Sequence, residues 1–126
     1  MAAGVFEDEG VDSPEVDWWP PLDIFECPED FLLVLALPGV GPDDVEVVQT
    51  GRILSIEGIR RVELPEGASA HLLESPRGRF QRRLRLPANC DTGAISSSLT
   101  DGQLIVRVPK VERRAVRVPV TTEYSP

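Results

Sequence analysis

Residues 95–108, ISSSLTDGQLIVRV, contain the strongest turn signal in the sequence, and the fold class follows from this stretch. Asp101-Gly102 separates two β-type segments, residues 95–99 and 104–108. An Asp-Gly dipeptide between two such segments is typical of a two-residue hairpin, because both positions adopt positive φ. The stretch therefore predicts two antiparallel strands joined by a tight turn.

Short apolar segments separated by turn residues recur along the rest of the chain. Residues 45–50 and 53–59 flank a second tight turn at Gly51-Arg52, and the continuously apolar segment 31–37 ends at Pro38-Gly39. An unbroken apolar run is typical of a strand that is buried on both faces. Two further strands are expected, at residues 22–26 and 78–86. The pattern predicts an all-β, antiparallel β-sandwich.

Length, charge and cysteine content narrow the class of protein. The chain has 126 residues, enough for one domain with a core, and a net charge of -8 that argues against nucleic-acid and anionic-membrane surfaces. The N-terminus lacks the features of a signal peptide, and no apolar run is long enough to span a bilayer. Cys27 and Cys90 are too few and too far apart for a disulfide framework or a metal site. We expect ordinary thiols in a reducing cytoplasm.

Charge is distributed unevenly along the chain. Residues 1–17 hold six carboxylates and no basic residue, which is typical of a solvated, disordered tail. Residues 77–86 hold five arginines, a run that could indicate RNA binding. Their alternation with Phe80, Leu84 and Leu86 instead favours one face of a strand.

Arg82 interrupts the apolar row formed by Phe80, Leu84 and Leu86. Burial of an unpaired arginine is very costly, so Arg82 is expected to be paired or to lie at an interface. Glu74 is one candidate partner.

Residues 59–77 form a long connection for a compact sandwich, in which most connections have about 4–6 residues. The segment contains an apolar piece of its own, residues 70–73. A long loop that carries its own strand is commonly functional, and it can reach another chain.

The chain offers no set of residues that could catalyse a reaction. Its only histidine, His71, has no orienting partner in the sequence, and Asp43-Asp44 lies in a turn. No phosphate-binding loop, nucleophile elbow or zinc motif is present in the sequence. We therefore expect a protein that is not an enzyme and has no cofactor, no catalytic residue and no metal site.

Four segments, taken in order, resemble the small heat-shock protein family, which is built on the alpha-crystallin domain. They are PPLDIFECPEDFLLVLALPGV (20–40), DDVEVVQTGRILSIEG (43–58), ESPRGRFQRRLRLP (74–87) and SSLTDGQLIVRVPK (97–110). The resemblance covers roughly residues 18–120. Ser97, Asp101 and Gln103 depart from the family's usual Ala, Asn and Val or Ile, but Asp-Gly serves the turn as well as Asn-Gly.

The resemblance implies an immunoglobulin-like sandwich that dimerises, assembles into larger homo-oligomers and holds unfolding client proteins without ATP. It divides the chain into an N-terminal tail (1–17), the domain (18–110) and a C-terminal extension (111–126). The alternative is an interaction module or co-chaperone adaptor with little holding activity. A short, acidic N-terminal region with few apolar residues keeps that alternative open.

The C-terminal extension carries an apolar row without a core of its own. Val116, Val118 and Val120 share one side of an extended chain. Members of the resembled family carry an Ile-x-Ile/Val motif there, which docks in a groove on a neighbouring subunit. Val118-Pro119-Val120 matches this motif best, and Val116-Arg117-Val118 is the overlapping alternative. Valine buries about one methylene less than isoleucine, roughly 0.8 kcal/mol per site, so docking is expected to be weaker.

The resemblance also places the surfaces that such a protein would use. The docking groove is expected between the strand of Val45 and Val47 and the strand of Leu104 and Val106. The alternative is that all four are ordinary core residues. Residues 70–74 are expected to pair with the partner's strand at residues 22–26. The expected dimer interface comprises Leu22, Ile24, Leu72, Leu73, Glu74 and Arg82.

Overall fold

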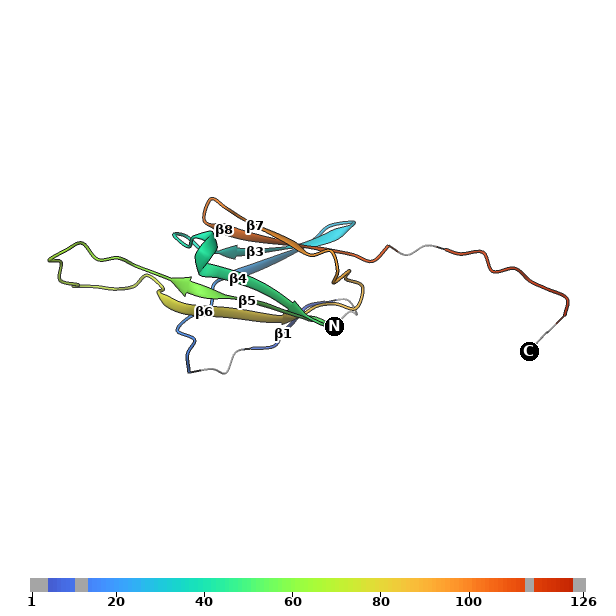
Figure 1. Ribbon diagram of the computed structural model, residues 1–126, viewed down its shortest axis with the longest axis horizontal. Helices are drawn as coiled ribbons and strands as arrows, with labels where there is room; N and C mark the ends of the chain where they lie inside the picture. The colour runs from blue at the N-terminus through green and yellow to red at the C-terminus, as the bar shows by residue number, and fades with distance from the viewer. Residues whose placement is uncertain (1–4, 11–13, 113–114, 124–126) are drawn as a thin grey trace.

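The computed structural model describes residues 5–10, 14–112 and 115–123 (Figure 1). Its regular elements are short and, apart from one single-turn 3-10 helix, all are strands. In chain order they are β1 (Glu7–Asp8), β2 (Leu22–Glu26), β3 (Asp30–Ala36), η1 (Pro42–Asp44), β4 (Val45–Thr50), β5 (Ile53–Arg60), β6 (Gly78–Arg85), β7 (Ser96–Thr100) and β8 (Gln103–Pro109).

The strands form two sheets that pack face to face (Figure 1). Sheet A has the order β1-β6-β5-β4 and sheet B the order β2-β3-β8-β7, and every neighbouring pair is antiparallel. The fold is therefore the all-β, immunoglobulin-like antiparallel sandwich that the sequence predicts. Both predicted hairpins are confirmed: Asp101 and Gly102 have φ of 52° and 74°, and Gly51 has φ of 58°.

The core lies between the two sheets and consists of alternate residues from each strand. Leu33, Leu54 and Val106 are among its fully buried members. The prediction that residues 31–37 are buried on both faces is wrong, because Leu32 and Val34 are only half-buried on the outer face of sheet B. No third layer of the described chain covers that face, so only every second residue of β3 enters the core.

Part of the acidic tail, for which the sequence predicts a disordered segment, lies against the sandwich in the structure. β1 pairs with β6, and the Phe6 ring packs edge-on against Phe31 at a centroid distance of 5.1 Å. A Glu9 carboxylate oxygen lies 2.8 Å from Arg85 Nε. The arginines of β6 thus attract the carboxylates of the tail and close that edge of sheet A. Residues 1–4 and 11–13 of the tail lie outside the described residues.

Candidate functional site

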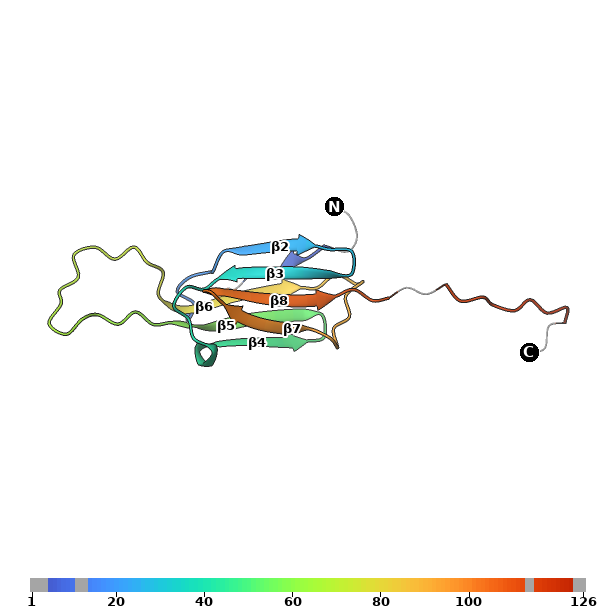
Figure 2. The same ribbon diagram turned by 90° about the horizontal axis from the view of Figure 1, so that it is seen from above.

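The connection between β5 and β6 extends away from the sandwich (Figure 2). Leu72 and Leu73 are 75% and 53% exposed. The strand predicted at residues 70–74 does not form within this single chain, since a lone strand needs a sheet edge to satisfy its backbone groups. The loop therefore leaves an apolar segment exposed in this single chain.

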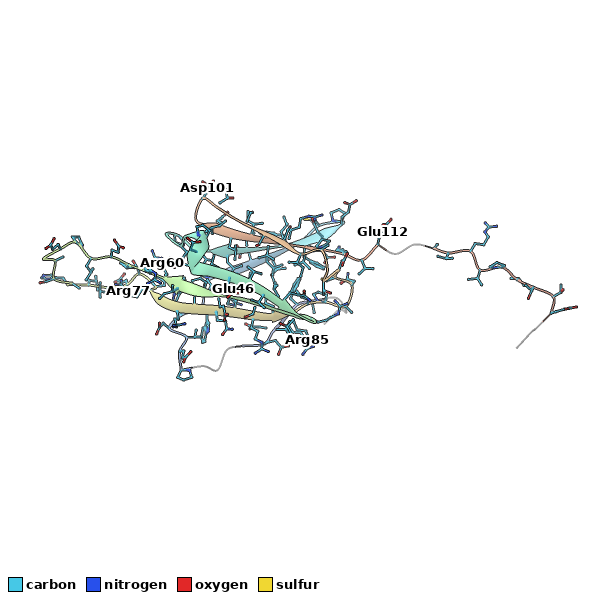
Figure 3. All side chains as sticks on the ribbon, viewed as in Figure 1. Glu46, Arg60, Arg77, Arg85, Asp101 and Glu112 are labelled. Carbon is cyan, nitrogen blue, oxygen red and sulfur yellow. The ribbon has the colours of Figure 1, made fainter. Side chains whose placement is uncertain are left out.

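Arg60 holds the base of this loop against the sandwich. Its Nε donates to the Pro38 carbonyl oxygen at 2.8 Å, and its Nη1 donates to the Pro76 carbonyl oxygen. Figure 3 shows Arg60 and Arg77 at the two ends of the loop. These hydrogen bonds fix the points at which the loop leaves and rejoins the sheet.

β2 is an edge strand of sheet B, with β3 on one side only. Leu22 is half-buried against the core, and Ile24 is 38% exposed. In the described part of the chain no strand pairs with the other side of β2. This edge can accept an added strand.

Arg82 is paired within the chain, but not with Glu74. Its Nη1 donates to the Pro20 carbonyl oxygen at 3.0 Å, and its Nη2 lies 3.4 Å from Asp8 Oδ2. The side chain is 20% exposed because it lies beside buried Phe80 and Leu84 at the rim of the sandwich. Glu74 has no hydrogen bond or ion pair within the described residues.

Arg82→Ala is expected to destabilise the fold by about 1–3 kcal/mol, because the buried Pro20 carbonyl loses its donor. The exposed ion pair with Asp8 adds less than about 1 kcal/mol. The total loss of folding free energy is smaller than the loss expected if Arg82 were paired with a buried carboxylate. Urea unfolding measures the change. Arg83→Ala, on the exposed neighbouring residue, is the control, and an equal loss in both variants would contradict the assignment.

The structure places the expected groove residues in two different environments. Leu104 and Val106 are buried, and β8 lies between β3 and β7 rather than at an edge. Val45 and Val47 are partly buried at the edge of sheet A. The two valines therefore lie at an edge, whereas Leu104 and Val106 belong to the core.

The edge strand of sheet B on the same side of the sandwich as β4 is β7 (Figure 2). Ile95 and Leu99, on the β7 side, pack partly buried against the core, as Val45 and Val47 do. Sequence reasoning missed these two residues, although Ile95 and Leu99 stand out as apolar positions among serines. Partly buried apolar residues therefore lie on β4 and on the β7 side of the core.

The C-terminal segment, residues 115–123, is extended and runs away from the sandwich (Figures 1 and 2). Val116, Val118 and Val120 are 77%, 76% and 97% exposed. Such an apolar row in solvent gains free energy when it is covered. Residues 113–114 and 124–126 of the extension lie outside the described residues.

Ionisable groups are scattered rather than grouped into a reactive site. Among the described residues no cluster of three or more His, Cys, Asp or Glu could hold a metal ion, and no helix could cross a membrane. His71 is exposed in the loop. Cys27 and Cys90 carry free thiols, and burial raises the pKa of the Cys90 thiol against smaller opposing effects of Arg52 and Lys110. A neutral, buried thiol is a poor nucleophile.

Comparison with known proteins agrees with this architecture. The model of the Hsp20/alpha crystallin family matches residues 23–121. The 17.3 kDa class II heat shock protein of Solanum peruvianum is 37% identical over 107 residues, which cover 83% of this chain and 69% of the relative. The 21.9 kDa heat shock protein of Oryza sativa subsp. japonica is 36% identical over 128 residues, which cover 94% of this chain and 59% of the relative. The chain thus spans 59% to 69% of the length of these two relatives.

Solved structures show the same fold. The small heat-shock protein from Xylella fastidiosa is 34% identical with a TM-score of 0.76, and the match covers 86% of this chain and 100% of that one. The hspA protein from Xanthomonas axonopodis is 37% identical with a TM-score of 0.67, and the match covers 74% of this chain and 94% of that one.

A β-sandwich with open edges and exposed apolar segments has the features that strand addition requires. The chain belongs to the Hsp20/alpha crystallin family. Membership supports a role as a small heat-shock chaperone, in a family whose members generally assemble into oligomers and bind clients.

Proposed function

We propose that this protein is an ATP-independent holdase, which binds unfolding proteins in the cytoplasm as a dimer-based oligomer. One observation carries the proposal: the chain exposes two apolar segments, residues 70–74 and 115–120, together with open sheet edges that fit added strands. A protein that assembles reversibly through such segments can expose apolar surface to a client when it dissociates.

An aggregation assay tests the holdase activity. A heat-labile client is warmed with and without the protein, in the absence of ATP, and light scattering is recorded. The holdase proposal predicts suppression that increases with the ratio of protein to client. An interaction module or adaptor on the same fold predicts no suppression, although the protein still forms oligomers.

Docking of the C-terminal segment is tested separately. Changing Val118 and Val120 to Ala, or deleting residues 114–126, is expected to lower the assembly size toward dimers. Each Val→Ala change removes two methyl groups from a docked side chain, roughly 1–2 kcal/mol. Light scattering at matched protein concentration measures the mass. An unchanged mass would show that the extension does not hold the assembly together.

A further inference from the structure

Glu46 on β4 carries a charge that nothing in the described part of the chain neutralises. It lies directly opposite Glu57 of β5, and like charges in this position destabilise a sheet. Gln81 Nε2 lies 3.3 Å from a Glu57 carboxylate oxygen, whereas Glu46 has no hydrogen bond or ion pair within the described residues. Glu46 points to the outer face, because its neighbours Val45 and Val47 pack toward the core. Figure 3 shows its position on sheet A.

The surface around Glu46 is hollowed and predominantly acidic. An open groove of about 600 Å³ runs along this part of sheet A. Its charged lining residues are Glu15, Asp43, Asp44, Glu46, Glu57, Arg61 and Arg79. Asp44 is within 3.4 Å of Arg61, so one of the two arginines is already engaged. The groove therefore favours a positively charged occupant.

The C-terminal segment has the complementary pattern. Val116-Arg117-Val118 matches Val45-Glu46-Val47 residue for residue, with an arginine in the place of the glutamate. Residues that lie opposite each other on neighbouring strands point their side chains to the same face of the sheet. If Arg117 lay opposite Glu46, the valines of both strands would therefore face the core, and Arg117 would lie next to Glu46 on the outer face. The segment runs away from its own sandwich, which makes a second copy of the chain the donor (Figure 2).

We propose that the C-terminal segment of a second copy adds to the free edge of β4 with Arg117 opposite Glu46. This pairing makes Arg117 and Glu46 the residues that set the docking register. The inference rests on the proposed docking and selects between the two overlapping Val-x-Val motifs. A register centred on Pro119 would leave Glu46 opposite a residue without charge.

Pro119 fits this register as well. Backbone N–H groups of alternate residues point to the same side of an extended strand, so residues 116, 118 and 120 can donate to β4. The nitrogen of Pro119 then points to the outer side, where its missing hydrogen is tolerated at an edge. There it also hinders the addition of a further strand.

Charge reversal in the full-length protein tests the pairing. Glu46→Lys and Arg117→Glu are each expected to raise, by about tenfold, the concentration at which half of the protein is assembled beyond dimers. The double variant is expected to return to within about twofold of the parent. Sedimentation velocity over a concentration series measures this, and high salt should reduce the difference. Glu46→Lys puts a positive charge directly opposite the negative charge of Glu57. The substitution is therefore not expected to weaken the fold itself.

Glu29→Lys is the matched control, with the same change of charge on an exposed residue in the turn between β2 and β3. It is expected to assemble like the parent. If the double variant assembles no better than the single ones, the register is wrong. If the Val118 and Val120 changes to Ala also leave the mass unchanged, the docking itself is refuted, and not only its register.

Discussion

Replacing Leu72 and Leu73 with Asp is expected to give a folded monomer. Both side chains project from the loop and contribute nothing to the core of their own chain, so the fold should survive. In the proposed dimer they are buried on the partner, and two leucines contribute roughly 3–6 kcal/mol, or about 10²- to 10⁴-fold in the dissociation constant. Carboxylates in the same place add a desolvation cost. Analytical ultracentrifugation measures the mass, and circular dichroism measures the melting of the fold.

Leu64→Asp is the control for this change. Leu64 lies in the same loop and is 54% exposed, but outside the segment 70–74 that is expected to pair with β2 of the partner. It should leave the dimer intact. A dimer that survives the double change at Leu72 and Leu73 would place dimerisation elsewhere, and the loop would then be a connection only.

Gly58→Ala is expected to destabilise the domain by about 3 kcal/mol, which lowers the melting temperature by on the order of 10 °C. A Cβ atom at this position would overlap the Asp44 carbonyl oxygen and lie 2.7 Å from the Phe80 ring and 3.0 Å from Val45 Cα. Backbone atoms cannot move aside as the tip of a flexible side chain can. The start of β4 would therefore have to shift away from β5.

Gly58 allows β4 and the Phe80 ring to pack closely against β5. Gly58 lies directly opposite both Val45 and Phe80, and the Phe80 ring covers the position that a side chain would take. Gly41→Ala is the matched control, since a Cβ there meets nothing within 4 Å and its φ is -86°. Thermal unfolding of the two variants should separate them. Equal melting temperatures would mean that β4 adapts without cost.

Local chemistry explains why the strands and turns could be predicted from the sequence. The two turns, at Asp101-Gly102 and Gly51-Arg52, depend on the backbone angles of their own residues. Both hairpins can therefore be predicted without knowledge of the rest of the fold. Alternating apolar residues in β6 and β8 select the faces that enter the core. The exposed rows at residues 70–74 and 115–120 were also visible as apolar pieces without a core of their own.

The order of the strands, in contrast, was decided by the tertiary structure. Sequence periodicity shows which residues share a face but not which strand lies at an edge. Leu104 and Val106 lie on β8, which is flanked by β3 and β7, whereas β7 and β4 are edge strands. The partner of Arg82 could not be predicted for the same reason: Asp8 is 74 residues away and reaches it only because β1 adds to β6. Contacts between segments far apart in the chain depend on the packing of the whole sandwich, and no local pattern encodes them.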